Sequence, residues 1–434
     1  MSHSVAFYTL GCKLNFAETS TIGRQLTDKG FRKADFTDGA DLYVINTCSV
    51  TDHADRKCKK VVKEALKYNP AAYIVIVGCY AQLKPEEIAA IPGVDMVLGA
   101  AEKFQLPEHL HQLTKEPKTR VYNAPIKETN VFVPGFSEGD RTRTFMKVQD
   151  GCDYFCTFCT IPLARGASRS DTVSQTVERV RKTAESGVKE IVLTGVNLGD
   201  FGVLHGESFY DLIQQLDHIE GIDRFRISSI EPNLLSDEII DFVARSKRFV
   251  PHFHIPLQSG SDVILQRMRR RYLSELYQQR ITRIREKMPY CAIGVDVIVG
   301  FPGESEEDFL TTYRFLNELD ISYLHVFPYS ERPNTTARKM KEVVPVKERM
   351  RRSEMLRILS EKKRHLFYSA HRGSERPVLF EMEEKGNRMQ GFTDNYIKVS
   401  TDFDPLLVNE VVPVILGDFL PDGSMQAEIP VFTH

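Results

Sequence analysis

The first hundred residues alternate short apolar runs with amphipathic segments. Three runs, at 5–10 (VAFYTL), 41–47 (DLYVINT) and 73–78 (YIVIVG), are rich in β-branched residues and almost continuously apolar, which is typical of strands buried on both faces. Helical patterns at 15–29 and 51–68 separate them. Because strands that alternate with helices form parallel sheets with right-handed crossovers, this part of the chain is predicted to be a parallel α/β domain.

The same alternation continues through the middle of the chain. Further strands are predicted at 145–151, 190–197, 224–230, 252–259, 292–303 and 322–330, and helices at 170–185, 237–245, 262–287 and 305–318. Six such units are too few for a closed β/α barrel. We therefore expect a partial, open barrel, with its functional residues at the carboxyl ends of the strands.

The connections complete the expected architecture. A polar, Pro-containing stretch at 103–139 is predicted to be a linker, and a basic helix is predicted at 345–368. Short strands with turns follow that helix and predict a small all-β module. We expect an α/β protein with an N-terminal domain plus linker (1–137), a central open-barrel domain (138–370) and a C-terminal β domain (371–434).

Composition and charge add two expectations. The chain of 434 residues has 42% hydrophobic and 27% charged residues, no apolar run long enough to span a membrane, and no secretion signal in its first residues, MSHSVAFYTLG. We therefore expect a cytoplasmic protein with no membrane contact. Residues 338–372 carry 12 Lys or Arg against 4 Asp or Glu, whereas residues 373–434 carry 4 against 11. The basic stretch suits either phosphate binding or the solvated face of a helix.

Eight cysteines in such a chain indicate metal ligands or reactive thiols rather than disulfides. Cys12, Cys48 and Cys79 each follow one of the three N-terminal strands, so we expect them at one edge of the sheet, where open α/β sheets bind ligands. Cys58 and Cys291 match no ligand spacing and are interpreted as ordinary thiols.

The other three cysteines, Cys152, Cys156 and Cys159, form a C-x3-C-x2-C run in GCDYFCTFC. A structural zinc site closes with four protein ligands, and no nearby Cys or His supplies the fourth. Thiolates also bind iron–sulfur clusters. A cluster held by only three thiolates leaves one iron open to a ligand that is not protein.

This cysteine run resembles the signature of the radical S-adenosylmethionine (SAM) enzymes. The segments TLGCKLN, NTCSVT and VGCYAQ resemble the N-terminal domain of the methylthiotransferases within that group, and FCTIPLARG and HIPLQSGSDVILQRMRRRY resemble their radical domain. The C-terminal strands resemble the TRAM domain of RNA-modifying enzymes. The resemblance covers essentially the whole chain.

The resemblance implies two 4Fe–4S clusters, each with one open iron. Cys152, Cys156 and Cys159 would hold the cluster that binds SAM, and the three N-terminal cysteines would hold an auxiliary cluster that carries the sulfur. One SAM molecule would methylate that sulfur, and another would give the 5′-deoxyadenosyl radical that removes hydrogen from an unactivated carbon. The reaction implies an electron donor, such as ferredoxin or flavodoxin, and a sulfur source.

Further residues are expected to contact SAM. Phe158 is placed to pack on a flat ring or to shield the cluster. The other residues follow predicted strands. They are expected as follows: Gly195 and Asn197 near the methionine amino group, Glu231 near the ribose, Gln258 in the cavity, and Gly300 at a point where the backbone approaches adenine. TGVN departs from the Gly-Gly-Glu found in many radical enzymes, and each strand-end residue also suits a turn or cap. His252 and His254 are interpreted as core or rim histidines, and Ser305 as a helix cap.

Three substrates are known among these relatives: isopentenyladenosine in tRNA, threonylcarbamoyladenosine in tRNA, and an aspartate of a ribosomal protein. GCKLNFAET resembles the GCKxN…ET pattern of the second group more than the GCQMN or GCPKN of the others. We expect the substrate to be C2 of N6-threonylcarbamoyladenosine 37, in the anticodon stem-loop. Arg165 and the QRMRRRY stretch (266–272) are candidate partners for the threonine carboxylate, and 338–372 rather than the acidic C-terminal module is expected to hold the tRNA.

Functions of two other classes are alternatives. An iron–sulfur electron carrier would use only protein ligands and would not need a barrel with polar strand ends. An RNA-binding regulator that lacks chemistry would not need six cysteines in two trios. The enzyme hypothesis explains both features.

Overall fold

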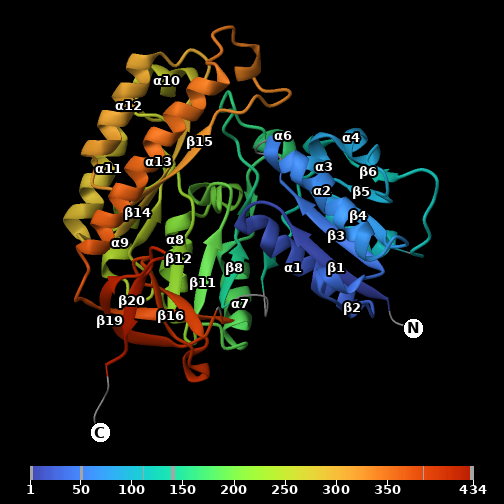
Figure 1. The fold of residues 1–434 in the computed structure, drawn as a ribbon, viewed down its shortest axis with the longest axis horizontal. Helices are drawn as coiled ribbons and strands as arrows, with labels where there is room; N and C mark the ends of the chain where they lie inside the picture. Colours follow the sequence, from blue (N-terminus) through green and yellow to red (C-terminus); the bar gives the residue numbers. More distant parts are fainter. Residues whose placement is uncertain (1–2, 49–51, 111, 138–141, 385, 431–434) are drawn as a thin grey trace.

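The computed structural model describes residues 3–48, 52–110, 112–137, 142–384 and 386–430 (Figure 1). The start of the helix expected at residue 51 lies outside these ranges. Within them, the chain forms an N-terminal parallel α/β domain, an open central barrel and a small closed β-barrel at its C-terminal end.

The N-terminal domain is a six-stranded, all-parallel sheet in the order β2-β1-β3-β4-β5-β6. Its strands are β1 (Ser4–Thr9), β2 (Arg32–Lys33), β3 (Leu42–Thr47), β4 (Tyr73–Gly78), β5 (Met96–Leu98) and β6 (Arg120–Tyr122). Its α-helices are α1 (Lys13–Asp28), α2 (Asp52–Tyr68), α3 (Cys79–Leu83), α4 (Pro85–Ala89) and α5 (Leu106–His109). Every residue of β3 and β4 is buried, because apolar clusters pack on both faces of the sheet.

Two short strands interrupt the stretch that the sequence predicts to be a linker. β6 adds an edge strand to the N-terminal sheet, and β7 (Gly135–Phe136) pairs antiparallel with the first strand of the central domain. Strands of two or three residues carry too little alternation to be recognised in a polar stretch.

The central domain contains six parallel strands, as predicted. They are β8 (Arg143–Lys147), β11 (Glu190–Thr194), β12 (Arg224–Ile227), β13 (His252–His254), β14 (Ala292–Val299) and β15 (Tyr323–Pro328). β8, β11 and β12 form one sheet and β13, β14 and β15 another, and bridges at Phe225–Phe249 and Ser229–His254 join them. No ladder returns from β15 to β8 in the described chain, so the predicted partial, open barrel is confirmed.

Helices cover the outside of this barrel (Figure 1). They are α7 (Val173–Ala184), α8 (Phe209–Leu216), α9 (Asp237–Arg245), α10 (Asp262–Arg267), α11 (Ser274–Lys287), α12 (Glu306–Glu318) and α13 (Val346–Ser369). Ser305 caps α12 in a capping box with Asp308, as expected of a cap residue. The single helix predicted at 262–287 is wrong: Arg269 adopts a left-handed backbone (φ 57°), and α10 and α11 are separate.

The barrel strands alternate between an apolar outer face and a polar inner face. Ile191, Leu193 and Phe225 belong to the large core under the helices. Because successive side chains of a strand point to opposite faces, the residues between them face the barrel interior. These inner-face residues include Arg143, Lys147, Glu190, Arg224, Arg226, His252, His254, Asp296, Tyr323 and His325.

The C-terminal module is a closed barrel in the order β16-β17-β18-β20-β19. Its strands are β16 (Glu375–Glu384), β17 (Arg388–Thr393), β18 (Lys398–Asp402), β19 (Val411–Phe419) and β20 (Met425–Glu428). Arg226 of β12 donates hydrogen bonds to the carbonyl oxygens of Asp394 (3.1 Å) and Thr393 (3.4 Å). This module therefore covers the end of the central barrel where its strands begin, and leaves the carboxyl ends of the strands for function (Figure 1).

Candidate functional site

The cysteine run forms a tight loop after β8 and the short strand β9 (Gln149–Asp150). It begins at Gly151 (φ 74°), where a Cβ atom would lie 1.9 Å from the carbonyl oxygen of Ala167, so only glycine fits. The backbone N–H of Cys152 donates to the Gly166 carbonyl (3.0 Å), and that of Thr157 donates to Met268 (3.1 Å). The loop is thus clamped between the end of α6 (Ile161–Arg165) and the turn after α10.

Each of the three sulfur atoms accepts a hydrogen bond. The backbone N–H of Tyr154 lies 3.3 Å from Sγ of Cys152 and that of Ile161 lies 3.4 Å from Sγ of Cys159, while Arg270 Nη1 lies 3.1 Å from Sγ of Cys156. Hydrogen bonds to the sulfur ligands are one of the factors that set the reduction potential of an iron–sulfur cluster. Burial raises the pKa of both Cys152 and Cys159 to about 12. A bound metal cation would stabilise them as thiolates and release their protons, and the donor set fits such a cluster.

Arg270 also forms an ion pair with Glu231, the residue expected near the ribose of SAM. The left-handed turn at Arg269 separates α10 from α11 and brings this guanidinium beside the loop. Arg270 is therefore held by Cys156 and Glu231, and Arg271 stacks on Tyr154 with 3.8 Å from its Cζ to the ring centroid. Arg270 is thus already paired within the fold, whereas Arg271 is exposed, and the expectation of a carboxylate partner in this stretch stays a prediction.

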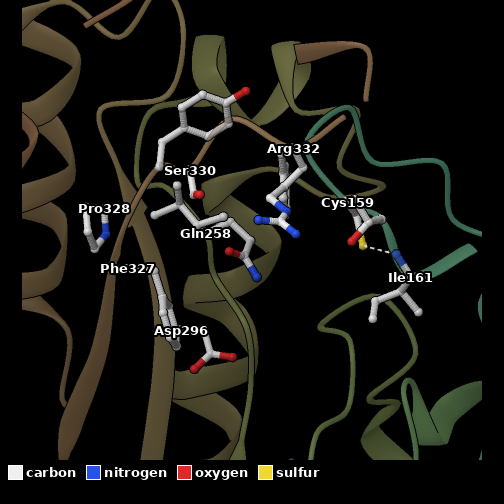
Figure 2. A pocket seen from close by; sticks show the side chains of 12 residues that line it. Cys159, Ile161, Gln258, Asp296, Phe327, Pro328, Ser330 and Arg332 are labelled. Carbon is white, nitrogen blue, oxygen red and sulfur yellow. Dashed lines mark hydrogen bonds between the residues drawn. The ribbon is translucent and has the colours of Figure 1, made fainter. Parts of the chain in front are cut away.

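A cavity of about 300 Å³ opens beside the loop. Its lining includes Phe158, Cys159, Gln258, Asp296 and Arg332. Figure 2 shows the Arg332 guanidinium between Gln258 and Cys159. Gln258 has a left-handed backbone (φ 70°), an uncommon conformation for a residue with a Cβ atom. Such strain is concentrated at ligand sites.

The remaining residues expected to contact SAM lie elsewhere around the loop. Val196 and Asn197 donate their backbone N–H groups to Oε1 of Gln149 (2.8 and 2.9 Å), and a Cβ atom at Gly195 would lie 2.9 Å from the same oxygen. Gly300 is not among the residues that line the cavity, and the space of its missing Cβ atom is filled by the side chain of Arg349 (2.3 Å to Cγ).

The N-terminal cysteines follow the carboxyl ends of three neighbouring strands, as expected from the strand order. Cys48 and Cys79 directly follow Thr47 and Gly78, which pair in β3 and β4. Cys12 follows β1, whose Thr9 pairs with Asn46 of β3. A Cβ atom on Gly11 would lie 2.7 Å from Cβ of Cys48, which shows how closely these loops approach one another. Three soft donors at one sheet edge, with no disulfide between them, fit a metal cluster.

A buried ionic network, which the sequence did not reveal, joins the two cysteine trios. Arg165, from the helix after Cys159, donates to Oε1 of Glu18 and Oδ1 of Asp150 (both 2.9 Å) and to Oδ1 of Asn15 (2.8 Å). Glu18 and Asn15 belong to α1, which begins directly after Cys12. Arg165 is 2% exposed. Glu18 and Asp150 also pair with Lys103, Lys147 and Arg169, so four cations share two carboxylates. The role of Arg165 as partner of the substrate carboxylate stays a prediction.

The two histidines of β13 have defined partners. His252 is buried and its Nε2 lies 2.9 Å from the hydroxyl of Tyr323, while Nε2 of His254 lies 2.8 Å from Oδ1 of Asp296. His325 completes a group whose ligand atoms all lie within 4.8 Å of one another. The interpretation of these histidines as core and rim residues agrees with this geometry.

An open β/α barrel with three thiols on the loop after its first strand defines a radical SAM enzyme. The Radical SAM superfamily model matches residues 146–316, and the model of the uncharacterized protein family UPF0004 matches residues 4–99. The superfamily implies SAM and one 4Fe–4S cluster. The fold is similar to the radical SAM methyltransferase TsrM from Kitasatospora setae, with a TM-score of 0.57 and 14% identity over 78% of this chain and 77% of that one.

Full-length relatives define the family more narrowly. The chain is 40% identical to the threonylcarbamoyladenosine tRNA methylthiotransferase MtaB of Bacillus subtilis, over 95% of this chain and 93% of that protein, and 42% identical to that of Aquifex aeolicus, over 92% and 96%. It is 32% identical to the tRNA-2-methylthio-N(6)-dimethylallyladenosine synthase of Geobacter sulfurreducens, over 97% and 96%. The chain belongs to the radical SAM methylthiotransferase family, and its C-terminal barrel is consistent with a TRAM-like domain. No helix in the described ranges has the length and apolar character needed to cross a membrane.

Proposed function

We propose that this protein inserts a methylthio group at C2 of N6-threonylcarbamoyladenosine 37 of tRNA, with SAM and two 4Fe–4S clusters. The observation that carries the proposal is the pairing of two cysteine trios across one buried ionic network, from Cys12 through Asn15 to Arg165 and the loop of Cys159. Each trio offers three thiols. One cluster suits SAM, and the other suits the sulfur that is transferred.

The residues of the chain have distinct roles in this proposal. Cys152, Cys156 and Cys159 hold the cluster that, when reduced, supplies the radical chemistry of SAM. Phe158 and Gln258 line the cavity in which SAM would bind. Gly195, Asn197, Glu231 and Gly300 are proposed contacts of SAM on the strand ends around it. Cys12, Cys48 and Cys79 hold the proposed auxiliary cluster.

The substrate is proposed from the sequence identity of this chain to two groups of relatives. Relatives named for threonylcarbamoyladenosine are 35% to 42% identical to this chain, whereas those named for dimethylallyladenosine are 30% to 35% identical. Both groups match over most of their length, so the difference is not caused by a missing domain. An electron donor such as ferredoxin or flavodoxin and a sulfur source complete the proposed set of partners.

The tRNA is proposed to bind at the basic segment before and at the start of α13. Arg338, Lys339, Lys341 and Lys347 are exposed there. Several other cations of 338–372 are engaged within the fold: Arg349 pairs with Glu331, and Arg352 pairs with Glu304 at 2.8 Å. The RNA-binding part of the basic stretch is therefore proposed to be residues 338–347.

Nucleoside mass spectrometry of tRNA tests the function directly. Deletion of the gene should remove the 2-methylthio form of threonylcarbamoyladenosine and leave the isopentenyl-derived nucleosides unchanged, and the wild-type chain should restore it. The opposite pattern would transfer the proposal to the isopentenyladenosine group.

Iron analysis tests the cofactors. The anaerobically reconstituted protein should hold about eight irons. Replacing either cysteine trio by alanine should remove about half of them, and the Cys291→Ala control, in a buried thiol remote from both trios, should retain all. A wild-type protein with only four irons would contradict the auxiliary cluster.

A further inference from the structure

The amino end of α1 is inserted into the open side of the central barrel. Ala17 of this helix packs with Phe145 of β8 and Val192 of β11 in a small apolar cluster of their own. Since Met146, Ile191 and Leu193 face the outer core, Phe145 and Val192 point inward, and α1 therefore touches the inner face of the barrel. Residues four apart lie on the same face of a helix, so Lys13 is on the side of Ala17.

The charges around Lys13 place its ammonium group in the barrel interior. Lys13 lies close enough to Arg226, Arg143 and Glu190 to interact with them electrostatically. Lys13 also lies within electrostatic range of His252 and His325. These inner-face residues belong to β8, β11, β12, β13 and β15, and only the interior is close to so many strands of one barrel.

Within the described residues, the side chain of Lys13 forms no hydrogen bond and no ion pair with an anionic group. Glu190, the nearest candidate, is already shared by Arg226 (2.8 Å) and Arg224 (3.7 Å). The first turn of α1 contains no acidic residue, and the side chain of Cys12 does not cap it. The positive end of the helix dipole therefore adds to the charge of Lys13 and favours an anion at this place.

We infer that Lys13 binds the carboxylate of the threonine in threonylcarbamoyladenosine and so determines the substrate. The inference rests on the proposed function. It assigns to Lys13 a role for which Arg165 and Arg270 are less suited, because both are already paired within the fold.

The chemistry of the base agrees with this position. C2 and C6 of adenine flank the same ring nitrogen, N1, so the substituent on N6 lies on the side of the purine that includes C2. A base whose C2 faces the sulfur held by the Cys12 trio therefore carries its threonine toward the residues beside Cys12. Lys13 is the next residue in the chain and its flexible stem ends in a compact cation.

The test uses reconstituted holoenzyme and two anticodon stem-loop RNAs that differ in one group. One carries threonylcarbamoyladenosine, and in the other the threonine carboxylate is a neutral carboxamide. Affinity is measured by fluorescence anisotropy and turnover as kcat/KM, for the wild type, Lys13→Gln, Lys13→Arg and the matched control Lys29→Gln at the exposed far end of α1. Iron content and the spectra of both clusters report whether each variant is intact.

The wild type and Lys29→Gln should prefer the carboxylate RNA by about 10- to 100-fold, the range expected for a charged hydrogen bond. Lys13→Gln should bind both RNAs alike, and Lys13→Arg should keep most of the preference. A wild type with no preference, or a Lys13→Gln protein that keeps it, would overturn the inference. Absence of any product from wild-type enzyme on the carboxylate RNA would instead overturn the proposed function.

Discussion

Nη1 of Arg165 lies 2.9 Å from Oε1 of Glu18, and the two side chains are 2% and 0% exposed. The two residues are 147 positions apart. Arg165 ends the helix that follows Cys159, and Glu18 lies in the first half of the helix that follows Cys12. This buried pair therefore fixes how the two cysteine trios are oriented toward each other.

Removal of one member of this pair should destabilise the protein strongly. Arg165→Gln removes hydrogen bonds to Glu18, Asp150 and Asn15. Lys103, Lys147 and Arg169 still pair with the two carboxylates, so the expected cost is that of lost charged hydrogen bonds, about 1.5–3 kcal/mol. Chemical denaturation should show this decrease in the free energy of unfolding. The control Arg364→Gln, in an exposed pair with Glu361, should cost less than about 1 kcal/mol. Equal effects of the two substitutions would contradict the role of Arg165.

Acid should weaken the barrel through Glu190. Burial raises the pKa of this carboxyl, but Arg226, Arg143 and Arg224 lower it further, from 4.5 to about 2 overall. Because its pKa in the folded state is lower than the ordinary value, ionised Glu190 stabilises the fold at pH values above 4.5. This contribution, about 3 kcal/mol, is lost as the pH falls from 4.5 toward 2. The free energy of unfolding of Glu190→Gln, measured by urea denaturation at several pH values, should fall less steeply in this window. Parallel profiles for the two proteins would refute the prediction.

Arg270 should raise the reduction potential of the cluster held by the Cys156 loop. Its N–H group lies 3.1 Å from Sγ of Cys156, and both a hydrogen bond to sulfur and a nearby positive charge favour the reduced cluster. Arg270→Gln should shift the midpoint potential to more negative values in a redox titration followed by EPR. Arg271→Gln, at the adjacent residue that stacks on Tyr154, is the control and should shift it less.

Gly151 should be essential for the cysteine loop. Gly151 and Gly187 have similar left-handed backbones, with φ of 74° and 77°, but a Cβ atom at Gly151 would lie 1.9 Å from a carbonyl oxygen, whereas at Gly187 nothing lies within 4 Å. Gly151→Ala should lose the iron of this loop, measured by iron analysis. Gly187→Ala introduces only backbone strain, about 1 kcal/mol, and this variant should retain the iron. Full iron in Gly151→Ala would show that the loop tolerates a side chain.

Charge reversal at the basic segment should weaken tRNA binding and its salt dependence. Changing Arg338, Lys339 and Lys341 to Glu removes exposed cations, and each lost phosphate contact should reduce the slope of log K against log salt by about 1. The control Arg388→Glu lies on the acidic C-terminal barrel. Point changes are preferable to deletion of 373–434, because that module also supplies hydrogen-bond acceptors to Arg226. A larger effect of Arg388→Glu would place the tRNA on the C-terminal barrel.

The elements with strong local patterns were predictable. Buried runs such as 73–78 become strands because their apolar side chains need cover on both faces. The strand order then brings Cys12, Cys48 and Cys79 to one edge, and the spacing of Cys152, Cys156 and Cys159 makes one loop. The break at Arg269 was missed because the helical pattern continues on both sides of a residue whose left-handed backbone depends on its surroundings.

By itself, the sequence determined the parallel domain, the open barrel and the grouping of the cysteines, since these follow from local periodicity and spacing. Only the tertiary structure decided which charged residues are available to a ligand. Arg165 and Glu18 meet because two domains pack together, and Lys13 reaches the barrel interior because α1 docks there. Burial and pairing between distant segments set the role of a charged side chain, and no local pattern records them.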